Sequence, residues 1–141
     1  MTPDPRTLDH VAIVVADLEA TIDLYVNTLG FRVVYREIVA DQGIEAVGLD
    51  AGGSIIELLR PLDPASPIAR FLGDAPTKMH HTAYRVADLP AELARLKAAG
   101  VRLIDAAPRK GAHGNAIAFL HPKSTGGVLI ELCQRTASRS S

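Results

Sequence analysis

The sequence predicts an α+β protein built from two tandem βαβββ modules whose strands form a cupped mixed sheet. Three observations support this prediction. The segment 8–18 reappears as 79–89, in the same register, and the segment 55–59 reappears as 129–133. In both copies, a histidine in the first segment is followed by a glutamate in the second. Internal repetition of this length indicates two copies of one structural unit.

The first module spans about 8–61 and is expected to contain one helix and four strands. Its opening run of β-branched residues predicts a strand. Asp17 can cap a helix that ends at Gly30, because apolar residues recur along 18–29 with helical spacing. Three further runs predict strands at 31–39, 44–49 and 54–60.

The second module spans about 78–135 and repeats this plan. Asp88 can cap its helix, Pro90 suits the first turn, and Gly100 ends it. Strands are expected at 101–103, 115–120 and 128–134. A linker at about 62–77, with a short helix at 68–72, joins the modules into one domain that covers residues 1–141.

Composition excludes several classes of protein. Fifteen basic and sixteen acidic side chains give a net charge of −1, which leaves no basic field for nucleic acid. Cys133 is the single cysteine, so no internal disulfide can form. No apolar run reaches the roughly 20 residues of a membrane span, and the first residues do not resemble a signal peptide. We therefore expect a cytoplasmic protein.

The repeated histidines and glutamates predict a metal site. Because strand side chains alternate, His10 and His81 should point away from the apolar residues that follow them. Each glutamate stands alone in an apolar strand, where a buried carboxylate needs a cation or a hydrogen-bond donor. A lone strand histidine is usually structural, but here the pairing occurs twice. We expect one divalent ion to be held by four ligands: His10, Glu57, His81 and Glu131.

Two imidazoles and two carboxylates suit a borderline ion such as Co, Mn, Zn, Ni or Fe, and do not suit an all-oxygen calcium site. Four ligands leave two positions of an octahedral ion open for substrate oxygens. The expected site is therefore catalytic.

This pattern resembles the vicinal oxygen chelate superfamily over residues 8–135, and within it the family of methylmalonyl-CoA epimerases. The resemblance rests on four stretches of sequence: Leu-Asp-His-Val-Ala at 8–12, the doublet at 80–81, His-Pro-Lys-Ser at 121–124, and Gly-Val-Leu-Ile-Glu-Leu at 127–132. The His-Pro-Lys-Ser turn distinguishes these epimerases from glyoxalase-like relatives.

The resemblance implies epimerisation of (2R)- and (2S)-methylmalonyl-CoA through an enolate formed by proton removal at C2. Cobalt is the ion that it favours, and it implies a homodimer. It assigns Glu45 as one proton-transfer base and the ligand Glu131 as the second. We expect desolvation beside apolar neighbours to raise the pKa of Glu45. The turn residues Lys123, Ser124, Gly126 and Gly127 would approach the acyl-CoA substrate.

Two other functions use the same fold. A glyoxalase I acting on a glutathione hemithioacetal would have the same four ligands. A non-catalytic protein that sequesters a small drug would not need them, and retention of all four argues against it. A ring-cleaving dioxygenase needs only two histidines and one carboxylate, which would leave Glu57 surplus.

Overall fold

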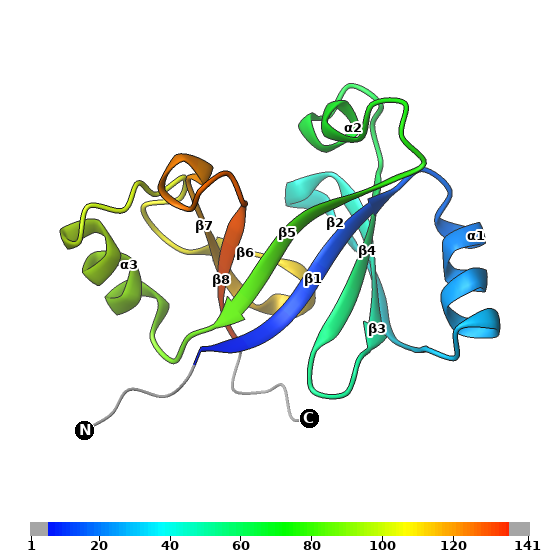
Figure 1. The fold of residues 1–141 in the computed structure, drawn as a ribbon, viewed down its shortest axis with the longest axis horizontal. Coiled ribbons are helices and arrows are strands. Elements are labelled where there is room, and N and C mark those ends of the chain that lie inside the picture. The colour runs from blue at the N-terminus through cyan, green and yellow to red at the C-terminus, as the bar shows by residue number, and fades with distance from the viewer. Residues whose placement is uncertain (1–5, 136–141) are drawn as a thin grey trace. The chain divides into compact units, whose positions relative to one another are not determined.

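The computed structural model describes residues 6–135, which form two compact units. We call residues 10–80 the N-terminal unit, and residues 81–135 together with 6–9 the C-terminal unit. The chain passes between the units after Asp9, within strand β1 (Thr7–Val15), and after His80, within strand β5 (Thr77–Arg85) (Figure 1). Residues 1–5, in which we expected no signal peptide, lie outside the described part of the chain.

The N-terminal unit contains a mixed sheet with the strand order β2-β3-β4-β1. Strands β1 and β4 run parallel, and the other two pairings are antiparallel. After β1, its elements are α1 (Leu18–Asp23), β2 (Arg32–Val39), β3 (Ile44–Asp50), β4 (Ile55–Pro61) and α2 (Pro67–Leu72). The expected short helix in the linker is present.

Helix α1 begins where the sequence predicts and then changes geometry. The Asp17 carboxylate accepts a hydrogen bond from the Ala20 N–H at 3.0 Å, which satisfies one of the first free amides. From Leu24 to Thr28 the chain forms a π-helical turn, with the Leu29 N–H donating to the Leu24 carbonyl. The helix expected up to Gly30 is therefore α-helical only in its first part.

The C-terminal unit repeats this arrangement with the strand order β5-β8-β7-β6. Strands β5 and β8 run parallel, as β1 and β4 do. After β5, its elements are α3 (Leu89–Ala98), β6 (Arg109–Lys110), β7 (Ala116–Leu120) and β8 (Ile130–Gln134). Among the described residues, no helix is long and apolar enough to cross a membrane.

One predicted strand is wrong. Residues 101–103 form no strand, and Leu103 makes only an isolated bridge to Leu120. The reason is an irregular backbone pairing, in which the Ile104 and Asp105 N–H groups both donate to the Phe119 carbonyl. The strand that follows α3 is instead the two-residue β6.

Helices α1 and α3 each cover one face of the sheet in their own unit. In the N-terminal unit, Leu18 packs with Val15, Val47, Leu49 and Leu58. In the C-terminal unit, the buried residues of α3 pack against β7 and β8 through Leu89, Leu93, Ala118, Leu120 and Leu132. The prediction of an α+β fold with two βαβββ modules is confirmed.

Candidate functional site

In the N-terminal unit, a buried histidine and glutamate meet on the sheet face opposite helix α1. Ala12 of β1 lies opposite Glu57 of β4, so His10, two residues before Ala12, shares the face of Glu57. The two side chains approach at 3.7 Å between His10 Nε2 and Glu57 Oε1. They are only 7% and 4% exposed. A carboxylate this deeply buried requires a polar or cationic partner.

The second oxygen of Glu57 is held by a tyrosine that the sequence analysis did not identify. The Tyr35 hydroxyl of β2 donates to Glu57 Oε2 at 2.6 Å. Tyr35, Gly48 and Glu57 form one row across β2, β3 and β4. A Cβ atom at Gly48 would lie 2.2 Å from the Tyr35 ring, so the ring can cross β3 only over a glycine. A glycine inside a strand is the sequence signal that could have indicated this close approach.

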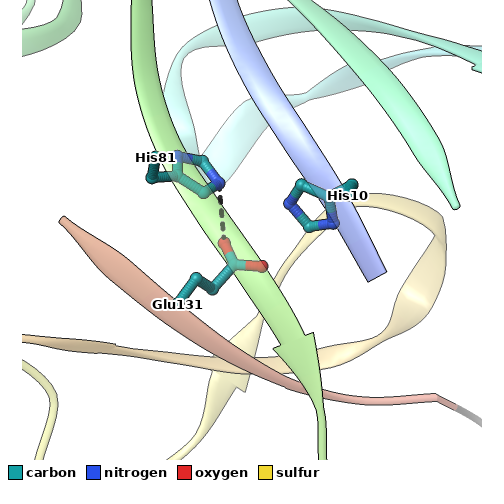
Figure 2. A group of neighbouring side chains, drawn as sticks. All are labelled: His10, His81 and Glu131. Atoms are coloured by element: carbon teal, nitrogen blue, oxygen red, sulfur yellow. Dashed lines mark ion pairs between the residues drawn. The ribbon is translucent and has the colours of Figure 1, made fainter. Parts of the chain in front are cut away.

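The C-terminal unit contains the matching pair. Nε2 of His81, from β5, lies 3.3 Å from Oε1 of Glu131, from β8. Figure 2 draws this ion pair as a dashed line. Ala83 lies opposite Glu131, which places His81 on the same sheet face as the glutamate. The ring of Phe119, from β7, stands edge-on to the His81 imidazole with centroids 5.1 Å apart. This neighbour is apolar, in contrast to the hydroxyl beside Glu57.

Asp9, the residue before His10, anchors the start of β1 in the C-terminal unit. Its carboxylate is 2% exposed and accepts hydrogen bonds from the Nε atoms of Arg85 and Arg135, each at 2.9 Å. Arg85 ends β5 and Arg135 follows β8. These ion pairs fix the backbone from which His10 projects.

The donor atoms fit a metal ion. Figure 2 draws His10, His81 and Glu131, whose imidazole nitrogens and carboxylate oxygens are typical ligands of borderline divalent ions. The neighbouring His80 packs its ring edge-on against Phe71 at 4.8 Å, within the N-terminal unit. This packing agrees with the choice of His81 over His80 as the candidate ligand.

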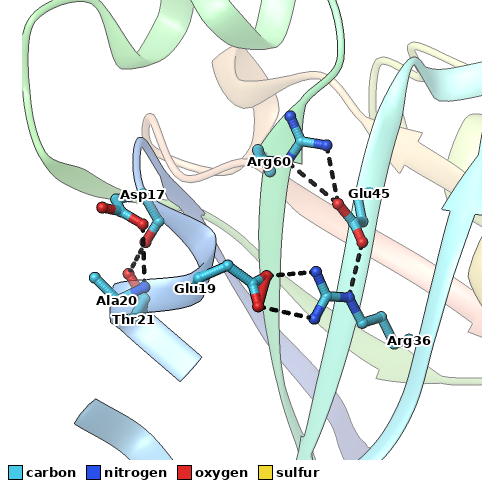
Figure 3. Close-up of polar contacts among 7 residues, drawn as sticks. All are labelled: Asp17, Glu19, Ala20, Thr21, Arg36, Glu45 and Arg60. Atoms are coloured by element: carbon cyan, nitrogen blue, oxygen red, sulfur yellow. Dashed lines mark hydrogen bonds and ion pairs between the residues drawn. The ribbon is translucent and has the colours of Figure 1, made fainter. Parts of the chain in front are cut away.

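Glu45 does not have the environment that the sequence analysis expected. It shares a face of β3 with Val47 and Leu49, as expected, but that face packs against helix α1 and is opposite the face of Glu57. Arg36 Nε donates to its carboxylate at 2.8 Å and Arg60 donates from the other side at 2.9 Å (Figure 3). These arginines, Arg36 first, lower the pKa of Glu45.

The expected rise in the pKa of Glu45 is therefore wrong, because two ion pairs outweigh desolvation. Arg36 also binds Glu19 of α1, so the Glu45 cluster joins the helix to the sheet (Figure 3). The assignment of Glu45 as a proton-transfer base stays a prediction, and in the structure its carboxylate is held by Arg36 and Arg60.

The four turn residues expected to approach the substrate lie between β7 and β8. Ser124 Oγ accepts from the Arg102 N–H at 2.9 Å, and the Gly127 N–H donates to the Pro122 carbonyl at 2.8 Å. Gly126 and Gly127 have φ values of 71° and 98°, which favour glycine. The turn, which also carries Lys123, is thus well organised, and its two glycines allow close approach of a ligand to the backbone.

A cavity of about 660 Å³ lies elsewhere in the C-terminal unit. Its lining includes Pro90, Ala116 and Gln134. Ala116 and Gln134 face helix α3, with the Gln134 amide oxygen accepting from the Leu89 N–H. The cavity is therefore on the helix side of the sheet, away from the face that carries Glu131.

Comparisons with known proteins agree with this geometry. A sequence model of the Glyoxalase/Bleomycin resistance protein/Dioxygenase superfamily matches residues 9–119. The chain is 45% identical over 129 residues to the ethylmalonyl-CoA/methylmalonyl-CoA epimerase of Cereibacter sphaeroides, covering 90% of this chain and 96% of that protein.

Two solved structures are also similar. The crystal structure of methylmalonyl-CoA epimerase from Mycobacterium tuberculosis has a TM-score of 0.87 at 43% identity and covers 92% of this chain and 88% of that one. A methylmalonyl-CoA epimerase in complex with methylmalonyl-CoA and NH4+ has a TM-score of 0.88 at 35% identity, over 98% of this chain and 100% of that one.

Proposed function

Because the chain belongs to the Glyoxalase/Bleomycin resistance protein/Dioxygenase superfamily, and within it to the family of methylmalonyl-CoA epimerases, we propose that it interconverts (2R)- and (2S)-methylmalonyl-CoA. The observation that carries this proposal is the buried His–Glu pair present in each of the two units. The similarity to an epimerase solved with methylmalonyl-CoA supports the substrate.

The proposed cofactor is one divalent ion, with Co²⁺ preferred and Mn²⁺, Zn²⁺, Ni²⁺ or Fe²⁺ as alternatives. The ligands would be His10, Glu57, His81 and Glu131. Both pairs are buried, and two carboxylates balance the charge of a dication. When bound, the ion supplies positive charge that stabilises the developing enolate.

Epimerisation also requires two groups that exchange protons with C2 on opposite sides of the enolate plane. The C2–H bond breaks, its electron pair enters the enolate, and the proton moves to a carboxylate. A second carboxylic acid then delivers a proton to the other side. We assign Glu131 to one of these roles, as the sequence analysis did, and reassign the other role from Glu45.

Glu37 is the carboxylate that replaces Glu45 in this proposal. It pairs with Ala46 across β2 and β3, and Ala46 pairs with Leu59. This row lies next to the row of Tyr35, Gly48 and Glu57, on the same sheet face. Glu45 is the neighbour of Ala46 in β3 but points to the helix side.

The remaining features of the proposal concern the acyl-CoA and the assembly. The turn with Lys123, Ser124, Gly126 and Gly127 would hold the pantetheine arm, since its two glycines let the backbone approach a ligand. We propose a homodimer in the cytoplasm. Sedimentation of the purified protein tests the dimer, because a monomer mass would contradict it.

The test of function is deuterium uptake at C2 of single-enantiomer methylmalonyl-CoA in D2O. Cobalt-loaded protein is compared with a chelator-stripped sample. We expect metal-dependent uptake of one deuteron with loss of optical purity. Exchange no faster than in the stripped sample would contradict the substrate assignment, and the hemithioacetal of glutathione would then test the glyoxalase alternative.

A further inference from the structure

The Glu57 carboxylate is not symmetric in its surroundings. Oε1 faces His10 Nε2 at 3.7 Å, whereas Oε2 accepts the Tyr35 hydroxyl at 2.6 Å. The short distance to a buried carboxylate is typical of a charge-assisted hydrogen bond. One oxygen therefore accepts a hydrogen bond from the tyrosine, and the other faces the candidate ligand His10.

We propose that Tyr35 is a positioning residue that makes Glu57 a single-oxygen ligand. Partners that hydrogen-bond a ligating side chain fix its orientation, and their removal costs about 10- to 100-fold in metal affinity. Tyr35 meets this description, because its hydroxyl reaches the ligand from β2 by crossing the whole of β3. This inference rests on the proposed metal centre.

Gly48 is part of this arrangement because it leaves room for the Tyr35 ring over β3. The Tyr35 ring occupies the space in which any larger residue would place its Cβ, 2.2 Å from the nearest ring atom. The ring therefore lies over β3 at Gly48, and its hydroxyl reaches Glu57. The pairing of a strand glycine with a cross-strand aromatic ring predicts that Gly48→Ala displaces the hydroxyl and weakens metal binding as Tyr35→Phe does.

A matched control separates the hydroxyl from general effects on packing. Tyr25 lies in the same unit, on the helix side of the sheet, with its ring 5.6 Å from that of Phe31. Tyr25→Phe removes the same hydroxyl oxygen as Tyr35→Phe, but on the helix side of the sheet, which is the face opposite to Glu57. It should leave metal affinity unchanged.

The experiment measures the Co²⁺ dissociation constant of apo-protein by competition with a chromophoric chelator, without substrate. Tyr35→Phe should weaken Co²⁺ binding by about 10-fold or more, at the level of an outer-shell partner. In the Glu57→Ala background, Tyr35→Phe should have no further effect, because its acceptor is gone.

Two results would overturn the inference: binding by Tyr35→Phe within two-fold of the wild type, or the same loss in the Glu57→Ala background. If the wild-type protein itself binds no divalent ion, the proposed metal centre fails and the role of Tyr35 toward it fails too. That outcome differs from one in which the wild type binds Co²⁺ and the Tyr35→Phe variant binds it equally well, which contradicts only the role of Tyr35.

Discussion

The two His–Glu pairs occupy equivalent positions in the two modules but have different surroundings. One oxygen of Glu57 faces His10 and the other accepts from the Tyr35 hydroxyl, whereas in the other pair the His81 imidazole packs at a right angle to the Phe119 ring. Repetition of a module therefore preserved the donor atoms and changed what surrounds them. The polar neighbour fixes Glu57 in place, which suits a ligand that takes no part in proton transfer.

The largest expected effect tests this division of roles. Glu131→Gln should lower the exchange rate by about 1,000-fold, since the amide still offers one oxygen to a metal but cannot act as the proton-transfer group, which contributes about 10²- to 10⁴-fold. Glu57→Gln should lower it by only about 10-fold, a loss at the level of a disturbed ligand environment, because a glutamine also offers one oxygen.

Single-turnover measurement of deuterium uptake with metal at saturation compares these two variants. Equal losses in Glu57→Gln and Glu131→Gln would show that the two glutamates act alike, and the asymmetry would then have no functional meaning.

The next prediction compares two carboxylates on opposite faces of the sheet, Glu37 of β2 and Glu45 of β3. Glu37→Gln should slow deuterium uptake by about 100-fold, as expected for loss of a general base. Glu45→Gln should change the rate little, because its carboxylate is bound by Arg36 and Arg60 on the helix side. The same uptake assay, with circular dichroism as a check on folding, measures both. A slow Glu45→Gln and a normal Glu37→Gln would restore the role first expected for Glu45.

The smallest effect concerns pH and compares one ion-pair cluster from each module. Arg95 and Arg6 lower the pKa of Glu92 from 4.5 to about 2, and Arg36 and Arg60 lower that of Glu45. A carboxyl group whose pKa is lowered in the folded state stabilises the fold at pH values above its unfolded-state pKa. This stabilisation is lost as the pH falls through the folded-state pKa. For Glu92 this window lies between about pH 4.5 and about pH 2.

Both clusters include exposed arginine side chains, so each should contribute less than about 1 kcal/mol. Urea unfolding at pH 7 and pH 3 measures the difference. Glu92→Gln and Glu45→Gln should each reduce the loss of stability between the two pH values. If either variant loses as much stability as the wild type between pH 7 and pH 3, its cluster does not contribute to the pH dependence of stability.

The candidate ligands were predictable because they occur in a repeated segment, and such a repeat can be recognised in the sequence without knowledge of any contact. The helix caps Asp17 and Asp88 were predictable for the same kind of reason, since they depend on local spacing. The strand pairing of residues 101–103 was not, because it depends on which carbonyl the Ile104 and Asp105 amides find across the sheet.

The wrong expectation for the pKa of Glu45 has a different cause. Alternation along β3 correctly grouped Glu45 with Val47 and Leu49, but it could not say which face of the strand meets helix α1. A carboxylate beside apolar residues was interpreted as desolvated, whereas two arginines from neighbouring strands reach it. Tyr35 was missed because its contact with Glu57 crosses an intervening strand, and only Gly48 hinted at it.

The most direct test of the central claim is the number of metal ions bound per chain. Apo-protein is titrated with Co²⁺ and examined by native mass spectrometry, with His10→Ala and His81→Ala as variants and His80→Ala as the control. We predict one ion per chain in the wild type and in His80→Ala, and none retained by His10→Ala or His81→Ala at the same concentration. Two ions per chain, or full retention by either ligand variant, would contradict a single centre held by both pairs.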